Sequence, residues 1–315
     1  MSTAVGEAPG KILLIGEHSV VYSHPAIAIP LRSVNARVES EFTRDGQITL
    51  GSDDLGEVAR PGQPVPDRLA PLVRLSQRVL ELFGEGKEGV RVRIRSTIPV
   101  GRGMGSGAAV AVALIRSLCK LLNRALDAEQ VMELALEAEK EFHGDPSGVD
   151  CAVVALNEPV YFTRGKPPQP IIAGRSAFRF VVADTGVVSP TRRVVEFVRQ
   201  ARDRDRARYD SFFWELGSMA SVAREVLRTG CAEEMALCMN RAHEILREMG
   251  VSSAELDQLV SAALENGALG AKLSGAGQGG VMIALLAEDG DEDKIIRGLQ
   301  LAGARQIFAT ALTGE

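Results

Sequence analysis

The chain has 315 residues, of which 45% are hydrophobic and 24% are charged, and its formal net charge is -5 at pH 7. This length suffices for one large or two ordinary domains, and the acidic balance argues against a nucleic-acid binder, which usually carries a basic surplus. No apolar run reaches the length of a membrane span, and the first eleven residues lack a signal-peptide pattern. We therefore expect a cytoplasmic protein that binds neither nucleic acid nor membrane.

Strand and helix patterns follow one another along the first part of the chain. Apolar runs or alternation predict strands over 11–15, 26–30, 36–42, 90–94 and 178–183. Helical spacing predicts helices over 67–83 and 127–142, the second capped by Asp127. The arginines that alternate with the apolar residues of 90–94 are expected to form a solvated strand face.

The second part of the chain is dominated by long helical patterns. They cover 190–206, 210–229, 231–249 and 252–266, and two strands around AKLSG and GGVMIALL precede a last helix from about 291. We expect an α+β protein with a domain boundary near residue 185, which gives an N-terminal domain over 1–185 and a C-terminal domain over 186–315.

The cysteines and histidines indicate no metal or disulfide framework. No cysteine pair has the C-x-x-C spacing, so we expect Cys119, Cys151, Cys231 and Cys238 to be free thiols in a reducing compartment, the buried state being the default. No two of the four histidines have the spacing of zinc ligands.

The most informative stretch is PVGRGMGSGAAVAVALIRSL, residues 99–118, in which a glycine-rich loop runs into a helix of small residues. Glycine allows positive φ and close approach of the backbone to a ligand. The first turn of a helix presents unpaired N–H groups and the positive end of its dipole. The pattern therefore predicts an anion site, with phosphate as its occupant.

Other interpretations of this block have less support. Gly103, Gly105 and Ala108 fit a dinucleotide fingerprint, but no acid ends a second strand some 20 residues later. A G-x-x-x-x-G-K-[ST] phosphate loop is absent. A glycine-rich turn without a ligand stays open as an alternative.

A pair of acids follows in EAEKEFHGDPSGVD, residues 137–150. Glu139 lies near the end of a predicted helix, and Asp150 follows a Gly-Asp-Pro-Ser-Gly turn. Two such acids can converge on one cation or one hydroxyl, and Mg²⁺ needs only one or two carboxylates when phosphates and water supply the other ligands. The alternative is an exposed helix acid beside a turn aspartate.

Small residues also fill 274–280, between two predicted strands. A hairpin needs only about two to five loop residues, so this run predicts backbone that approaches a ligand. The N-terminal segment 7–31 adds Lys11, Glu17 and His18 beside a predicted strand and its loop.

Taken together and in this order, these blocks resemble those of the GHMP family of small-molecule kinases. The resemblance extends over nearly the whole chain. Its sharpest part is APGKILLIGEHSVVYSHPAIAIPL, residues 8–31, which is similar to the branch of the family that acts on mevalonate. A galactokinase would show Thr-Asp-Tyr after Gly-Glu-His. HGDPSGVD, residues 143–150, points to the same branch.

The resemblance implies a two-domain GHMP kinase fold. The N-terminal domain would hold a mixed sheet and the glycine-loop helix, and the C-terminal domain would be ferredoxin-like and helix-rich. It also implies transfer of the γ-phosphoryl group of ATP, with Mg²⁺, to the 5-hydroxyl of mevalonate in isoprenoid biosynthesis.

The resemblance assigns roles residue by residue. Asp150 matches the catalytic aspartate that faces the substrate hydroxyl, and Lys11 matches the lysine that pairs with it. Glu139 matches the Mg²⁺-binding glutamate. The loop over the ATP phosphates is matched by Gly101, Gly103, Met104, Gly105, Ser106, Gly107 and Ala108. The substrate side is matched by Glu17, His18, Asp150, Thr191, Ser274, Gly275 and Ala276.

Two positions depart from the family pattern. The family usually has Gly-Ser-Ser-Ala where this chain has Gly105-Ser106-Gly107-Ala108, and the second serine helps to hold Mg²⁺. Ser106 or water would then have to serve as the metal ligand, or the metal would sit differently. Gln278 replaces a glycine of the third block, and its long amide could alter the choice of substrate.

Several alternatives stay open at this point. The acceptor could be phosphomevalonate, the 3-hydroxyl of mevalonate or homoserine, and a protein of another class, a non-catalytic sensor of ATP or metabolite, would keep the same fold. The sequence leaves undecided whether Asp150 is a general base or an orienting group, whether isoprenoid diphosphates inhibit, and whether the chain forms a homodimer.

Overall fold

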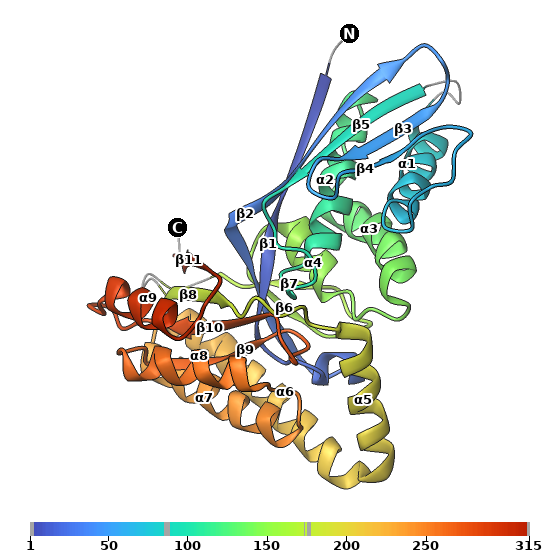
Figure 1. The fold of residues 1–315 in the computed structure, drawn as a ribbon. Helices are drawn as coiled ribbons and strands as arrows, with labels where there is room; N and C mark the ends of the chain where they lie inside the picture. The colour runs from blue at the N-terminus through green and yellow to red at the C-terminus, as the bar shows by residue number, and fades with distance from the viewer. Residues whose placement is uncertain (1–2, 85–88, 173, 175–177, 314–315) are drawn as a thin grey trace. The chain divides into compact units, whose positions relative to one another are not determined.

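The computed structural model describes residues 3–84, 89–172, 174 and 178–313. The chain forms two compact units, and each is discontinuous in sequence. Unit 1 comprises 1–10, 34–99 and 105–157, and unit 2 comprises 11–33, 100–104 and 158–315. Two long strands, β1 (Thr3–Ile15) and β2 (Ala26–Thr43), contribute residues to both units (Figure 1). The predicted boundary near residue 185 describes a different division of the chain and stays a prediction.

Unit 1 is built on the mixed sheet that was predicted. Strand β5 (Gly89–Ser96) pairs antiparallel with β2 and parallel with β3 (Ile48–Ser52), and β3 pairs antiparallel with β4 (Glu57–Ala59). The arginines of β5 form a solvated face, as expected, because Arg91 pairs with Glu41, and Arg93 and Arg95 both pair with Asp53.

Helices of unit 1 pack on one another and beside this sheet (Figure 1). They are α1 (Ala70–Phe83), α2 (Ser106–Leu121), α3 (Ala128–His143) and α4 (Val149–Leu156). Asp127 caps α3 as predicted, since its side chain accepts the Gln130 N–H while the Gln130 side chain accepts the Asp127 N–H.

Unit 2 contains a four-stranded antiparallel sheet in the order β11-β8-β10-β9. These strands are β8 (Phe178–Asp184), β9 (Gly270–Ser274), β10 (Val281–Leu285) and β11 (Gln306–Leu312). Two further short strands, β6 (Val160–Phe162) and β7 (Gln169–Pro170), pair with each other, and β6 also pairs with the start of β2.

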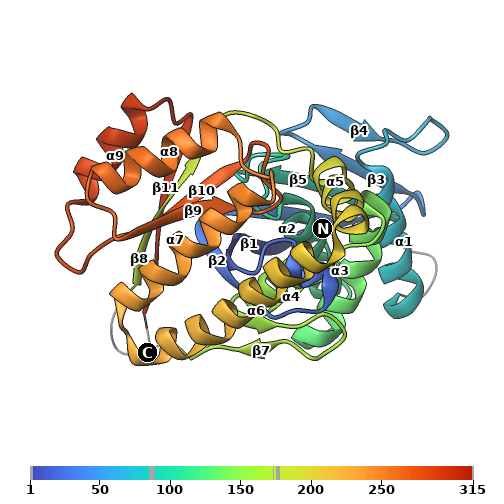
Figure 2. The ribbon, with the colours of Figure 1, turned by 90° about the horizontal axis from the view of Figure 1, so that it is seen from below.

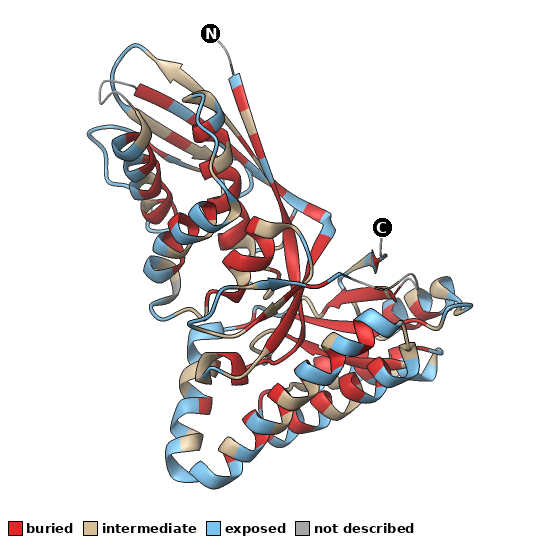
Figure 3. Cartoon of the chain, turned by 180° about the vertical axis from the view of Figure 1, so that it is seen from behind, coloured by how far each residue is buried: buried red, intermediate tan, exposed pale blue. Residues whose placement is uncertain are grey.

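Helices make up most of the remainder of unit 2, as the sequence predicts. They are α5 (Thr191–Arg204), α6 (Arg206–Thr229), α7 (Ala232–Glu248), α8 (Ala254–Glu265) and α9 (Glu292–Leu301), with a 3-10 turn, η1 (Ser19–Tyr22). Helices α7 and α8 contact β9, and α9 contacts β8 (Figure 2). Burial runs along one side of the long helices (Figure 3). No helix among the described residues is long and apolar enough to cross a membrane.

Strand β9 lies at the edge of its sheet, and side chains of α7 satisfy its outer backbone groups. Asn240 accepts the Ala271 N–H at 2.9 Å, and Nδ1 of His243 accepts the Leu273 N–H at 3.4 Å. An unpaired strand edge is a site for unwanted pairing, so these contacts close the edge and fix β9 just before its glycine-rich continuation.

Strand β2 joins two predicted strands into one, and Pro30 lies inside it. Proline lacks an N–H and is excluded from the centre of a regular ladder. Pro30 falls after the residues that pair with β6 and before those that pair with β5, where the partner strand changes. Pro30 therefore lies outside the residues of β2 that pair with β5 and with β6.

The contact of β1 with α2 gives a test of the packing in unit 1. A Cβ at Gly6 would lie 2.1 Å from the carbonyl oxygen of Ala113 and 2.5 Å from the Ser117 nitrogen, both backbone atoms of α2. We expect Gly6→Ala to lower the free energy of unfolding by at least ~2 kcal/mol, because β1 must move away from α2. Urea unfolding measures this.

The matched control is Gly51→Ala in β3 of the same unit, where the nearest atom is a Val58 methyl group at 3.6 Å. This variant should stay within about 1 kcal/mol of the parent. Equal stability of the two variants would contradict the close packing of β1 on α2.

Candidate active site

The glycine-rich stretch of residues 99–118, which we call the second glycine block, passes from unit 2 to unit 1 at the Met104–Gly105 bond. In unit 1, Gly105 has a φ of 71° and ends the loop, and Ser106 begins α2. Only glycine adopts this backbone geometry without strain. The first turn of α2 therefore offers the N–H groups and positive dipole end that favour phosphate, as the sequence predicts.

At position 107, the absence of a side chain leaves room for the carboxylate of Glu139. A Cβ there would lie 2.5 Å from Oε1 of Glu139, whose side chain is buried on α3. The carboxylate of Glu139 thus lies against the first turn of α2, in space that a side chain at 107 would take.

The oxygen donors of this region fit Mg²⁺. Within the described ranges, no group of three or more histidine, cysteine or acidic side chains could hold a metal ion by itself. Mg²⁺ nevertheless binds through one or two carboxylates when phosphate oxygens and water complete its shell. Glu139 and Ser106 match that requirement.

Asp150 lies in the first turn of α4 and is half-buried. The predicted turn before it is present, since Gly144 and Gly148 have φ values of 82° and 91°, and Gly148 caps α4. The next residue, Cys151, is buried, and burial raises the pKa of its thiol well above the ordinary value. Cys151 is therefore an inert thiol.

In unit 2, the remaining part of the second glycine block is held by backbone hydrogen bonds. The Lys11 N–H donates to the Met104 oxygen at 3.0 Å, and the Ser189 N–H donates to the Gly101 oxygen at 2.9 Å. Gly101 and Gly103 have φ values of 71° and 78°. The side chain of Lys11 is buried. The loop is thus fixed from two directions.

The third glycine block, residues 274–280, begins at the end of β9. Hydrogen bonds hold it to β1 and to Ser189. The Ser274 hydroxyl accepts the Leu13 N–H at 3.0 Å and donates to the Leu13 oxygen at 2.9 Å. The Ser189 hydroxyl donates to the Gly277 oxygen at 2.7 Å. Ser189 therefore links the two glycine blocks through its N–H and its hydroxyl.

Gln278 occupies a left-handed position, with a φ of 53°. Its side-chain amide donates to the carbonyl oxygens of Gly250 and Ser252 at 2.9 and 3.0 Å, and its N–H donates to the Val251 oxygen at 2.8 Å. The structure places this amide on the connection between α7 and α8, so here it anchors the loop.

The Gly-Glu-His segment of the first block is strained and buried. Gly16 and His18 have φ values of 107° and 59°. Nε2 of His18 lies 3.0 Å from the carbonyl oxygen of Ala276, and burial lowers the pKa of His18 to about 4. The imidazole is therefore neutral at pH 7, and it donates its Nε2 proton to that carbonyl. The structure thus joins His18 to Ala276.

Two other residues predicted on the substrate side lie in different surroundings. Glu17 is fully buried and pairs with Lys272, which is also fully buried. Thr191 is exposed and begins α5, and its N–H donates to the Ser189 oxygen at 2.9 Å.

Sequence reasoning missed Lys272 and Ser189. Lys272 was hidden in a predicted strand, although a lysine in an otherwise apolar strand before a glycine run is itself a signal. Ser189 carried no signal, because its importance lies in two contacts with distant loops.

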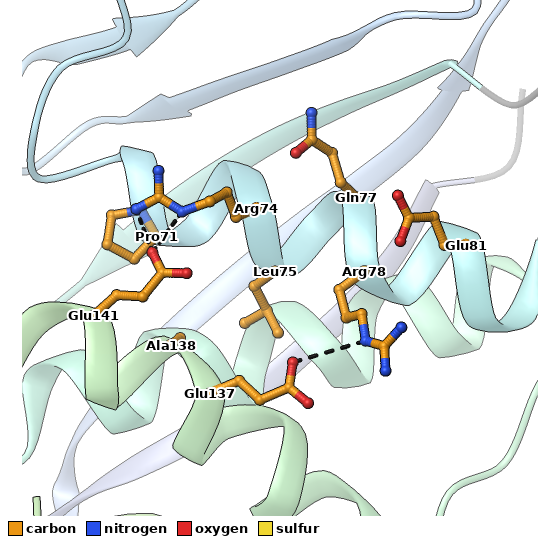
Figure 4. A pocket seen from close by; sticks show the side chains of 9 residues that line it. All are labelled: Pro71, Arg74, Leu75, Gln77, Arg78, Glu81, Glu137, Ala138 and Glu141. Carbon is orange, nitrogen blue, oxygen red and sulfur yellow. Dashed lines mark hydrogen bonds and ion pairs between the residues drawn. The ribbon is translucent and has the colours of Figure 1, made fainter. Parts of the chain in front are cut away.

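A shallow pocket of about 270 Å³ lies between α1 and α3 of unit 1 (Figure 4). Arg74 pairs with Glu141 across it, and Arg78 Nε lies 3.8 Å from Glu137 Oε2. Both of its arginines pair with acids of the facing helix, and none of the predicted site residues lines it. This pocket is therefore a seam between helices and no part of the candidate site.

Comparisons with known proteins agree with these blocks. The family model described as GHMP kinases N terminal domain matches residues 72–158, and that described as GHMP kinases C terminal matches 223–305. The mevalonate kinase of Aeropyrum pernix is 34% identical over 320 residues, which cover 99% of this chain and 97% of the relative. The mevalonate kinase of Thermococcus gammatolerans is 33% identical, with 95% and 93% covered.

A solved structure shows the same architecture. The mevalonate kinase of L. major in complex with R-mevalonate has a TM-score of 0.83 and 27% identity, with 100% of this chain and 97% of that chain covered. The chain belongs to the GHMP kinase family. It has the two-domain α+β fold of that family, and it is a small-molecule kinase.

The buried histidines predict an acid-sensitive fold. Burial lowers the pKa of His18 and His243 from 6.5 to about 4, so the unfolded chain binds more protons than the folded chain between these values. The folded state has its full stability relative to the unfolded chain above about pH 6.5, where both states hold neutral histidines, and it loses stability as the pH falls below this value. As the pH falls from about 7.5 to about 5, proton binding by each of these histidines in the unfolded chain should lower the free energy of unfolding by about 2 kcal/mol.

Urea unfolding at the two pH values measures this, with His243→Gln as the variant because glutamine keeps an acceptor for Leu273. The variant should show a smaller loss of stability than the parent. The matched control, His24→Gln, replaces a half-buried histidine and should change the pH dependence less. An identical pH dependence in the parent and His243→Gln would contradict the assignment.

Proposed function

We propose that this kinase transfers the γ-phosphoryl group of ATP to the 5-hydroxyl of mevalonate, a step of isoprenoid biosynthesis. The observation that carries the proposal is the identity of 34% over nearly the full length with a mevalonate kinase. The first sequence block supports the same acceptor, because Gly-Glu-His is followed by Ser-Val-Val-Tyr.

The glycine backbone from Gly101 to Ala108 would bind the phosphates of ATP. In its support, the loop has positive φ angles and leads into the N-terminus of α2, where N–H groups and the helix dipole favour anions. Glu139 and Ser106 would hold Mg²⁺. The bound ion neutralises phosphate charge, which phosphoryl transfer requires more than covalent assistance.

Asp150 would orient the acceptor hydroxyl and accept its proton. Lys11 would pair with that carboxylate. This pairing is carried over from the sequence resemblance. In-line positioning of the hydroxyl provides most of the rate enhancement in such a mechanism.

The mevalonate side would comprise His18, Thr191 and the backbone of Ser274, Gly275 and Ala276. In its support, His18 contacts Ala276, and Ser274 is fixed to β1. Glu17 belongs to the same side through its neighbour His18. We further propose a cytoplasmic location, a homodimer, and functional domains divided near residue 185.

ADP release with ATP, Mg²⁺ and mevalonate tests the function, with phosphomevalonate and homoserine assayed in parallel. The proposal predicts mevalonate-dependent turnover, and phosphorus NMR should show the phosphate on the 5-hydroxyl. Phosphate on the 3-hydroxyl, or turnover of another acceptor alone, would identify a different GHMP kinase. ATP binding without turnover of any acceptor would identify a sensor.

Asp150→Asn tests the role of the aspartate. Asparagine keeps the size but accepts no proton, so we expect turnover to fall by at least ~100-fold, the lower range for general acid–base catalysis. Binding of ATP should be retained. Steady-state kinetics and calorimetric titration with ATP measure the two quantities.

Asp145→Asn provides the matched control, because Asp145 is exposed in the turn before Asp150. This variant should keep the parent turnover. Near-normal turnover of Asp150→Asn would exclude the proton-accepting role.

A further inference from the structure

A buried ion pair connects the first and third sequence blocks inside unit 2. Nζ of Lys272 donates to Oε1 of Glu17 and, at 2.6 Å, to the carbonyl oxygen of Leu273. Both side chains are completely buried. The second oxygen of Glu17, Oε2, is buried and has no hydrogen-bond partner among the described residues.

Such a pair is a poor device for stability. Removing two charges from water costs several kcal/mol per ion in folded proteins, and well-packed apolar residues often replace a buried pair without loss. Burial is also the largest effect on Lys272, and it lowers the pKa of the ammonium group. An incompletely hydrogen-bonded carboxylate adds a further cost. Another function for the pair is therefore expected.

The surrounding contacts show what the pair holds. Residues 16–18 form a strained loop, with positive φ at Gly16 and at the non-glycine His18, and strained backbone persists only when its surroundings fix it. Glu17 is fixed to Lys272, and His18 is fixed to Ala276. Both partners lie at the ends of one five-residue stretch, 272–276.

We propose that the Glu17–Lys272 pair positions the acceptor substrate, because it holds His18 and the backbone of 274–276 in the geometry that binds mevalonate. Glu17 and Lys272 are positioning residues: they act through His18 and the glycine-rich backbone and do not touch the substrate. The inference rests on the proposed function for the identity of the acceptor.

The test compares single and double substitutions. Lys272→Met leaves the Glu17 carboxylate buried without a cation, so this variant should have a lower Tm. The double variant Glu17→Met with Lys272→Met removes both charges and keeps the volume, and its Tm should recover. If the pair positions the substrate, kcat/KM for mevalonate should still fall by about 100-fold in the double variant, the effect of a small misplacement, with KM for ATP unchanged.

A milder variant keeps the proposal testable if the double variant does not fold. Glu17→Gln retains an acceptor for Lys272 but removes the negative charge. It should raise KM for mevalonate in the same direction by a smaller factor, again without a change in KM for ATP.

The matched control removes an ion pair of the same unit that touches neither glycine block. Arg241 of α7 pairs with Glu215 of α6, and the double variant Glu215→Gln with Arg241→Met should keep the parent KM values. Parent kinetics in the Glu17 and Lys272 double variant, with a recovered Tm, would overturn the proposal and leave the pair a structural one.

A second readout does not depend on the substrate. Amide hydrogen exchange should become faster at residues 16–20 and 274–278 in the double variant and stay unchanged in the control. Unchanged exchange in both segments would also overturn the proposal. If the parent protein does not turn over mevalonate, the proposed function fails, while the exchange measurement still decides whether the pair fixes the two segments.

Discussion

The contacts made by strand β1 are the constraint on which both compact units depend. In unit 1, Gly6 lies so close to α2 that no Cβ fits between them. In unit 2, Lys11 and Leu13 bind the second and third glycine blocks through their backbone groups. The backbone groups of β1 make these bonds without a loss of side-chain rotamer freedom of their own. One strand thus packs against α2 in unit 1 and holds the second and third glycine blocks in unit 2.

The glycine loops illustrate a balance between freedom and anchoring. Positive φ angles at Gly101, Gly103 and Gly105 shape the second glycine block, but glycine loses more backbone entropy on folding than any other residue. The structure offsets this loss with hydrogen bonds from outside the loops. Ser189 is the clearest case, since a single residue binds Gly101 and Gly277.

Local patterns were sufficient to predict much of the fold. The periodicity of residues 127–142 and the capping Asp127 gave α3 within one residue at each end, because cap chemistry and amphipathic spacing are local. Helix α4 was not predicted, because its eight residues are an apolar run without helical periodicity. The short strands β3 and β4 were also not predicted, because strand formation there depends more on pairing with distant residues than on local composition.

The predicted site residues were found by their types and spacing, but their partners were not. Lys272 illustrates the reason: its role depends on Glu17, 255 positions away, and no sequence period connects the two. The roles of Asp150 and Lys11 came from a family resemblance, which names residues without their contacts. A single sequence therefore shows which chemistry is available, while the tertiary contacts show which groups are fixed.

The two departures from the family pattern follow one physical logic. Gly107 lacks the hydroxyl that usually stands at its position, and the space is filled by the carboxylate of Glu139, a stronger ligand for a hard cation than a neutral hydroxyl. Gln278 gives up the freedom of glycine at a left-handed φ, and three hydrogen bonds to 250–252 stabilise it there. At both positions, contacts with another part of the same unit accompany the departure: Glu139 lies against Gly107, and the 250–252 segment holds Gln278.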